Sequence, residues 1–501
     1  MQIQTFYLCA EIMPKPNKPK NVEDFFVDIH CHPTMRAFHT TPNGNEKNMW
    51  DCTKNDSVDT ILGRWSWNQS KGVSKYSQSN FYNCVTGKTR VVFDSLYPME
   101  RGFINLKKFP ELLLGKKNIE TLAVTASGLS LEQFRNYKKG NDYFNELNEQ
   151  YKFLVKNQGA SPCDKYDYKI VKNYNELGAS LKNNPTTIHV IVTIEGAHVF
   201  GCGTTSSEKT PFEELKQTLK NNISTVKQWE HVPFFITFAH HFWNQLCGHA
   251  TTIPSPTNLV CDQTKGLNSG FTELGLFVLE ELLSTKNGKR ILIDTRHMSV
   301  ESRRYYINYI SQHNKKYPTD HIPLISSHSA VNGFETFDNS VLRKDSKSKK
   351  KTTAFCAWSL NISAEEAVAI HDSGGIAGII MDKGRHSGIR LLKSIDKLKN
   401  VEEKKVLFLK LICDNIFVFI RSINKRSAWD ILTLGTDFDG VITHFDCYYE
   451  MSNLPELKKD LVNFLTKNRY KSELWFGYSP EEMMQKVFTQ NAMTFLEKNF
   501  K

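Results

Sequence analysis

The sequence lacks the features that mark several large classes of protein. It has no C-x-x-C pair, and its eleven cysteines are an odd number scattered over 501 residues; a disulfide framework has a different pattern. The first twenty residues show no basic segment followed by an apolar core, so they do not resemble a secretory signal. The most apolar long window, 406–420, is interrupted by Lys410 and Asp414 and is too short to span a bilayer. We therefore expect a cytoplasmic protein without a membrane segment.

A strong charge of one sign is also absent. Lys and Arg number 64 against 53 Asp and Glu, which gives a net charge of +11. The basic run at 343–351 is interpreted as a solvated loop rather than a contact with an acidic partner. No nucleic-acid recognition module accompanies it, so no nucleic-acid partner is expected. With 40% hydrophobic and 23% charged residues, the composition is that of a folded globular protein and excludes disorder as the main state.

The sequence has no repeat with a fixed period of 20–50 residues, which argues against a solenoid or a propeller. What recurs is a looser unit, in which a short β-branched run is followed by a loop and a helical stretch. This alternation indicates a parallel sheet with crossover helices. Eight segments are candidate strands: 25–30, 119–125, 188–195, 234–239, 291–294, 323–326, 376–380 and 431–435. The main candidate helices are 212–229, 272–283, 300–312, 364–370, 402–423, 454–466 and 480–498.

Eight strands with helices between them predict a (β/α)₈ TIM barrel. A doubly wound open sheet is the alternative, but such a sheet usually carries a glycine-rich phosphate loop, and neither G-x-G-x-x-G nor G-x-x-x-x-G-K-[ST] occurs. We expect a lead-in over 1–24 and a barrel over 25–501. Two stretches do not fit the repeat and are interpreted as long loop insertions, at about 39–98 and 333–358.

The first candidate strand ends in a pattern that can bind metal. Side chains alternate along a strand, so Asp28, His30 and His32 point to the same face. Two imidazoles in this arrangement can grip one metal ion. An isolated H-x-H of this kind is more often a pair of satisfied polar residues at a strand end.

The order of the other strand ends changes that assessment. Glu195 ends one apolar strand, His297 and His328 lie a few residues beyond two others, and Asp437 follows the last. Each signal is weak by itself. Together, an H-x-H, a Glu, two His and an Asp at the ends of different strands are what a binuclear hydrolase barrel needs, because two metal ions require about six ligands, one of them shared.

These motifs resemble those of the membrane dipeptidase (renal dipeptidase) family of zinc peptidases, in the amidohydrolase superfamily. The resemblance runs from about residue 27 to the C-terminus, interrupted by the two insertions. Its most specific pieces are 194–198 (IEGAH), 293–299 (IDTRHMS), 325–330 (ISSHSA) and 435–440 (GTDFDG).

The resemblance implies two Zn²⁺ ions per chain and a small peptide or amide substrate, cleaved by a hydroxide that bridges the metals. It implies that one ion is held by His30, His32 and Asp437, the other by His297 and His328, with Glu195 bridging both. His240 matches a histidine that contacts the substrate and stabilises the attacked carbonyl oxygen. Asp437 would take the proton of the attacking water and pass it to the leaving amine. The family is often dimeric, so a homodimer is one expectation for the assembly.

Asp28 and Asp439 are candidates for orienting the metal ligands, although a plain structural hydrogen bond explains each of them equally well. The sequence departs from the family at two points. The family often has H-x-D where this chain has His30 and His32, a change that removes one negative charge. Leu360 occupies the position of the arginine that pairs with the substrate's carboxylate in the family.

Arg343 or Arg385 would have to replace that arginine, and Arg385 is favoured because it follows the seventh strand and so lies on the correct face. Without a replacement, a dipeptide is a less certain substrate than an amide in general. Two alternatives therefore stay open. One is another enzyme of the superfamily that acts on a different amide, a lactam or an ester. The other is a barrel without catalytic activity.

Overall fold

Eight parallel strands close into a barrel in the computed structural model, which describes residues 25–39, 47–54, 76–104, 120, 129, 131–140, 142–253, 261–340 and 354–501. Neighbouring strands follow the order β2-β1-β10-β9-β8-β7-β6-β5, and β5 pairs back with β2 to complete the ring. Their bounds are β1 Phe26–Cys31, β2 Thr89–Leu96, β5 Thr187–Glu195, β6 Phe235–Thr237, β7 Leu292–Asp294, β8 Ile325–Ser329, β9 Ile376–Ile379 and β10 Leu432–Leu434. The predicted (β/α)₈ barrel is confirmed.

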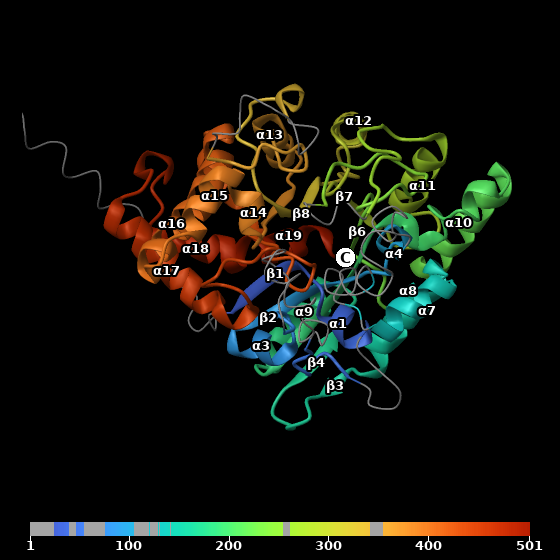
Figure 1. The fold of residues 1–501 in the computed structure, drawn as a ribbon, viewed down its shortest axis with the longest axis horizontal. Coiled ribbons are helices and arrows are strands. Elements are labelled where there is room, and N and C mark those ends of the chain that lie inside the picture. Colours follow the sequence, from blue (N-terminus) through green and yellow to red (C-terminus); the bar gives the residue numbers. More distant parts are fainter. Residues whose placement is uncertain are drawn as a thin grey trace, which may run out of the picture.

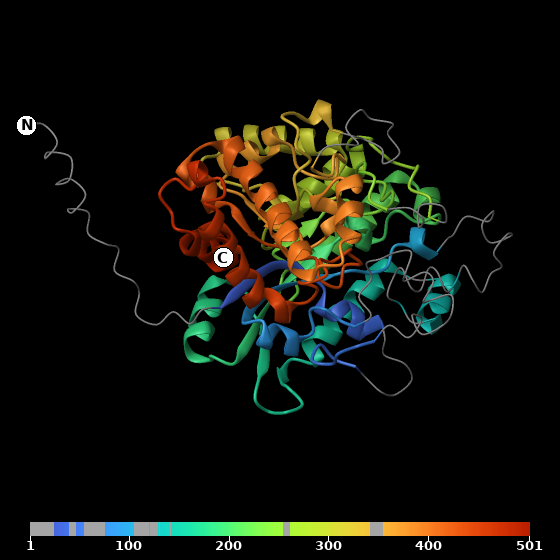
Figure 2. The same ribbon diagram turned by 60° about the vertical axis from the view of Figure 1, so that its left-hand side comes forward.

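Helices surround this ring (Figure 1 and Figure 2). In Figure 1, α16, α17 and α18 lie on one side and α7, α8 and α10 on the other. The helices that follow the barrel strands β5 to β10 include α10 Phe212–Lys227, α11 Glu273–Leu283, α12 Val300–Lys316, α13 Ala364–Asp372, α14 Lys383–His386, α15 Ile389–Asp396, α16 Val401–Ile423, α17 Leu454–Asn468, α18 Pro480–Gln485 and α19 Asn491–Asn499. Earlier in the chain lie α1 Pro33–His39, α3 Phe81–Thr86, α4 Arg101–Ile104, α7 Leu131–Lys139, α8 Tyr143–Lys156 and α9 Tyr174–Asn183. A short hairpin, β3 Gly159–Ala160 and β4 Asp167–Ile170, extends the sheet beside β5.

The second strand of the barrel differs from the prediction. The position expected for 119–125 is held by β2, Thr89–Leu96, which lies inside the segment interpreted as an insertion. Polar and apolar residues alternate less clearly from Arg90 to Leu96 than in the other strands, and a long polar stretch precedes this run. The sequence analysis therefore did not recognise it as a strand. Of 119–125, only residue 120 is described, and it is helical. The lead-in 1–24 and Arg343 lie outside the described residues, as does the central part of 333–358.

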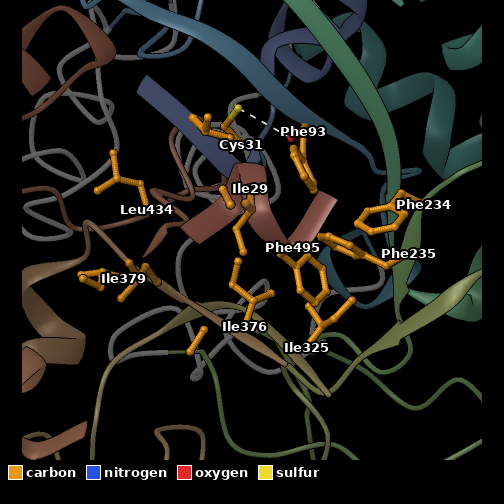
Figure 3. Packing of buried hydrophobic residues seen from close by; sticks show 14 of the residues in the cluster. Ile29, Cys31, Phe93, Phe234, Phe235, Ile325, Ile376, Ile379, Leu434 and Phe495 are labelled. Atoms are coloured by element: carbon orange, nitrogen blue, oxygen red, sulfur yellow. Dashed lines mark hydrogen bonds between the residues drawn. The ribbon is translucent and has the colours of Figure 1, made fainter. Parts of the chain in front are cut away.

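The two faces of β1 separate the apolar packing from the candidate site. Ile29 and Cys31 pack with Phe93 of β2, Leu434 of β10 and Phe495 of α19 in a continuous hydrophobic core (Figure 3). Asp28 and His30 alternate with them and therefore face the other way. Every residue of β1 and β5 is buried. The strand alternation thus places polar side chains inside the barrel while apolar ones bind the helices to it.

None of the described helices has both the length and the apolar character that crossing a bilayer requires. All cysteines in the described part of the chain are free thiols, and most of them are buried.

Candidate metal centre

Six side chains predicted to bind metal converge at the C-terminal ends of the barrel strands. We call them the ligand cluster: His30, His32, Glu195, His297, His328 and Asp437. The Glu195 carboxylate lies at its centre. Its Oε1 is 3.3 Å from His30 Nε2, and its Oε2 is 3.2 Å from His32 Nε2.

The later strands bring two imidazoles to the same carboxylate. Glu195 Oε1 lies 3.7 Å from His297 Nε2 and 3.9 Å from His328 Nε2. The two Nε2 atoms are 3.1 Å from each other. The sequence therefore predicted correctly that these residues, which are distant along the chain, would be brought together.

Asp437 completes the cluster on the side of β1. Its Oδ1 is 3.7 Å from His30 Nε2 and 3.4 Å from His32 Nε2. Two groups of donor atoms within the cluster are close enough together to hold an ion: His30, His32 and Asp437 form one, and His30, Glu195 and His328 form the other. Asp437 is 8% exposed, the largest exposed fraction in the cluster, so it is the member most open to a substrate.

Unpartnered nitrogen atoms show that this donor set fits a metal. Both ring nitrogens of His30, Nε2 of His32 and Nδ1 of His297 are buried without a hydrogen bond. A buried polar atom without a partner costs about 1–3 kcal/mol. Imidazole nitrogens mixed with carboxylate oxygens are the ligands that zinc prefers, so zinc would satisfy atoms that the protein leaves unsatisfied.

Hydrogen bonds outside the cluster orient two of its imidazoles. His32 Nδ1 donates to the Ser95 carbonyl oxygen at 2.8 Å, which turns Nε2 towards Glu195. His328 Nδ1 donates to Ser327 Oγ at 2.8 Å, and Ser327 Oγ donates to Asp294 Oδ2 at 2.6 Å. Both rings therefore turn Nε2 towards the centre of the cluster.

The charges in the cluster suit a cation. Burial and the neighbouring His240 hold the pKa of His297 well below its usual value, and burial and His30 do the same for the pKa of His328. Burial alone would raise the pKa of Glu195, but His240 and His30 lower it well below its usual value. Glu195 is thus an anion beside two neutral imidazoles. Burial would lower the pKa of His32, but Asp437 and Glu195 raise it well above its usual value, so a metal ion would replace a proton on that ring.

The backbone is strained where it delivers these ligands. His297 and Asp437 have φ angles of 62° and 60°, in the left-handed region that side chains other than glycine rarely adopt. Gly196, directly after Glu195, has φ 95°, and a Cβ atom there would lie 2.3 Å from His198 Nδ1. The turns after β5, β7 and β10 are therefore shaped by the positions of the ligands.

His240 lies beside the cluster, as predicted. Its Nε2 is 3.5 Å from Glu195 Oε2. Its Nδ1 is 2.6 Å from Oε2 of Glu100, a residue that the sequence analysis missed. Burial would lower the pKa of His240, but Glu195 and Glu100 together raise it. His240, His241 and His297 also form a group of donor atoms within 4.8 Å of one another.

Two arginines contact the segment at Leu360, Arg296 through the Leu360 carbonyl oxygen and Arg385 through the Trp358 ring. Leu360 itself is buried, and its carbonyl oxygen accepts a hydrogen bond of 2.6 Å from Nη1 of Arg296. Arg385 Nη2 donates to the Thr252 carbonyl oxygen at 3.2 Å, and Thr252 Oγ1 contacts His241 Nδ1 at 2.6 Å. Nη1 of Arg385 and Nε of Arg296 are buried without a hydrogen bond, so both guanidinium groups have unused donors.

The two aspartates proposed to orient ligands have different partners. Asp28 accepts hydrogen bonds from the backbone N–H groups of His30 and Thr436, so it ties β1 to the turn that carries Asp437. Asp439 binds Ser79 Oγ at 2.7 Å and Arg36 Nε at 2.9 Å. Asp439 therefore anchors neighbouring segments and touches no member of the cluster through a described hydrogen bond.

Comparison with known proteins gives no match to a family model and none to a curated protein. Among solved structures, the chain is similar to dipeptidase AC, a metallopeptidase of family M19 (12% identity, TM-score 0.48, 95% of this chain and 98% of that one). It is similar to the probable dipeptidase PvdM from Pseudomonas aeruginosa (13%, 0.49, 94% and 94%). It is also similar to a metallopeptidase from Rhodobacter sphaeroides bound to a phosphinate mimic of L-Ala-D-Ala (13%, 0.47, 88% and 96%).

Two of these structures are named as dipeptidases, the activity of the family that the sequence motifs resemble. Identities and TM-scores this low transfer no activity to the present chain. Its barrel is established by its own strand pairing, and its function is argued below from its own site.

Proposed function

We propose that the protein is a zinc-dependent hydrolase that cleaves the amide bond of a dipeptide or a related small amide. The observation that carries the proposal is the ligand cluster, in which four Nε2 atoms lie within 3.9 Å of Glu195 and several buried nitrogens lack a partner. An Asp437 oxygen lies within 3.7 Å of two of these Nε2 atoms. His30, His32 and Asp437 would hold one ion, His297 and His328 the other, and Glu195 would lie between them.

Bound zinc ions would lower the pKa of a water between them and polarise the carbonyl group that this water attacks. The chain supplies the remaining steps. Asp437 accepts a proton from the attacking water and returns it to the leaving amine, a role that suits the most exposed carboxylate of the cluster. His240 Nε2 points into the site and, with both ring nitrogens protonated, donates a hydrogen bond to the carbonyl oxygen as charge develops on it.

Arg385 is the residue proposed to bind the substrate's terminal carboxylate. Its side chain is 12% exposed, and its Nε lies 3.9 Å from Asp382 Oδ2. The guanidinium carbon lies 5.1 Å from the centroid of the Trp358 ring, and Nη1 is buried without a hydrogen bond. A planar guanidinium binds a carboxylate through two parallel hydrogen bonds. The buried Arg296 also keeps its Nε without a hydrogen-bond partner.

A second candidate function is hydrolysis of an amide, lactam or ester without a free carboxylate. Leu360 favours it, because an apolar side chain stands where the family's carboxylate-binding arginine is expected.

A substrate panel separates the two candidates. The zinc-loaded protein is assayed with dipeptides, N-acyl amino acids, lactams and lactones, and the same protein is assayed after chelation and again after zinc is returned. We expect zinc-dependent turnover of dipeptides. Turnover of lactones or lactams alone would favour the second candidate, and a folded protein that retains no zinc would contradict both.

A further inference from the structure

We infer that Glu100 is a positioning residue that holds the imidazole of His240 in its working orientation. The inference rests on the proposed function, since it concerns the histidine that contacts the substrate's carbonyl oxygen. It adds a carboxylate that lies outside the ligand cluster. Glu100 follows β2, the strand that the sequence analysis missed.

The Glu100 carboxylate accepts hydrogen bonds from three consecutive residues in the segment after β6. Its Oε2 accepts hydrogen bonds from His240 Nδ1 at 2.6 Å and from the backbone N–H of His241 at 3.2 Å. Its Oε1 accepts from the backbone N–H of Phe242 at 3.0 Å. A carboxylate that accepts several hydrogen bonds fixes both the ring and the backbone that carries it.

Glu100 is itself held in place from two sides. The hydroxyl group of Tyr97 donates to Glu100 Oε2 at 3.1 Å, and the Tyr97 ring meets the His240 ring edge-on, with centroids 4.7 Å apart. His198, in the turn after Glu195, contacts the Pro98 carbonyl oxygen through its Nε2 at 2.8 Å. The short segment from Tyr97 to Glu100 therefore contacts both the turn after β5 and the residues after β6.

These contacts determine which nitrogen of His240 faces the site. An ionised carboxylate can only accept hydrogen bonds, so Nδ1 must be the nitrogen that carries a hydrogen towards Glu100. Nε2 is then the nitrogen 3.5 Å from Glu195 Oε2, at the edge of the cluster. No described hydrogen bond or ion pair joins Glu100 to the ligand cluster, so its effect on the reaction passes through His240.

A merely structural role is the competing explanation, because Glu100 also binds two backbone N–H groups. A double-mutant cycle distinguishes the two roles. It compares E100Q, H240Q and the double variant in the zinc-loaded protein. If Glu100 acts through His240, E100Q lowers kcat about 10- to 100-fold with KM and zinc content little changed. In the H240Q background the same change then alters kcat less than about twofold.

Glu146→Gln is the matched control. Glu146 is a buried carboxylate of α8 that accepts hydrogen bonds from the Tyr137 hydroxyl at 2.6 Å and from the backbone N–H of Met99 at 3.3 Å. It therefore supports the same segment as Glu100 but has no described contact with His240. We expect E146Q to leave kcat within about twofold of the wild type. Effects of E100Q and H240Q that multiply fully in the double variant would overturn the inference.

A second readout is independent of turnover. In the proton NMR spectrum of the full-length protein, the Nδ1–H of His240 bonded to Glu100 should give a downfield imidazole resonance. We expect E100Q and H240Q to remove it and E146Q to keep it. If E100Q fails to fold, Tyr97→Phe, which removes one donor to Glu100, should shift the same resonance.

Persistence of the resonance in E100Q, or its absence from the wild type, would contradict the inference. If the resonance depends on both Glu100 and His240 but no substrate is turned over, the inference that Glu100 orients the His240 ring is supported and the proposed function is contradicted instead. The two failures are therefore distinguishable.

Discussion

His30 and His189 are both histidines of barrel strands, and neither has any exposed surface. Their surroundings differ. Both ring nitrogens of His189 are satisfied, since Nδ1 lies 3.2 Å from the Arg90 carbonyl oxygen and Nε2 lies 2.8 Å from Ser180 Oγ. Both ring nitrogens of His30 are buried without a hydrogen bond.

The difference separates a structural histidine from one prepared for a ligand. His189 lies near the N-terminal end of β5, where its hydrogen bonds link the strand to β2 and to α9. His30 lies at the C-terminal end of β1, where the side chains of other strands converge. A folded protein leaves such atoms unsatisfied at a cost, so the missing partner is expected to be an ion that binds there.

The largest expected effect comes from removing the charge at the centre of the cluster. We predict that Glu195→Gln lowers kcat/KM by at least about 10³-fold, because stabilisation of the transition state by the metal pair is worth several kcal/mol. The same variant should lose zinc while its circular dichroism spectrum stays that of the wild type. Glu146→Gln serves as the control and should keep both zinc and activity. An E195Q protein with full activity would contradict the assignment of Glu195.

Replacing the two contrasting histidines should have opposite consequences. His30→Asn should abolish activity and reduce the zinc content, yet destabilise the metal-free protein less than His189→Asn does, because neither nitrogen of its ring makes a described hydrogen bond. His189→Asn should keep the zinc but reduce the free energy of unfolding by about 1–3 kcal/mol, since it leaves buried partners unpaired. Urea unfolding and elemental analysis measure the two properties. Equal destabilisation by both changes would remove the distinction.

His189 should also make stability depend on pH. Burial lowers its pKa from 6.5 to about 4. The unfolded chain takes up a proton below pH 6.5, whereas the folded protein does so only near pH 4. The contribution of His189 is therefore fully present above pH 6.5 and is lost as the pH falls towards 4.

Between pH 7 and pH 5 this loss amounts to about 2 kcal/mol. The free energies of unfolding of the wild type and of His189→Asn, measured by urea titration at both pH values, should converge by that amount at pH 5. A gap between the two proteins that does not change with pH would show that His189 titrates normally.

The smallest predicted effect concerns Arg385, the residue proposed to bind the substrate's carboxylate. Arg385→Met should raise KM for a dipeptide about tenfold, the loss expected from one charged hydrogen bond, and should change kcat little. The test substrate is paired with its C-terminal amide, which lacks the carboxylate and should be insensitive to the change. Equal effects on both substrates would show that Arg385 does not bind the carboxylate.

The motifs at the strand ends were sufficient to predict the cluster because side-chain alternation and the parallel barrel fix where such residues meet. Glu195, His297 and Asp437 each follow an apolar run, and barrel closure brings these ends together. Glu100 could not be predicted in this way. It follows β2, whose apolar run is preceded by a long polar segment, and its sequence neighbours carry no ligand pattern.

Arg296 was missed for a different reason. It directly precedes His297 and carries no spacing signal, and its contact with the Leu360 carbonyl oxygen depends on how the loops after β7 and β8 pack together. Contacts between loops depend on tertiary packing rather than on the local period of the sequence. Side chains outside the strands therefore had to be located in the folded structure.

Anomalous X-ray diffraction at the zinc absorption edge, from crystals of the zinc-loaded protein, would test the metal centre most directly. Two peaks are expected. One should be bounded by His30, His32 and Asp437, the other by His297 and His328, and both should lie within coordination distance of Glu195. Zinc bound only at other residues, or no anomalous peak among these six side chains, would contradict the assignment.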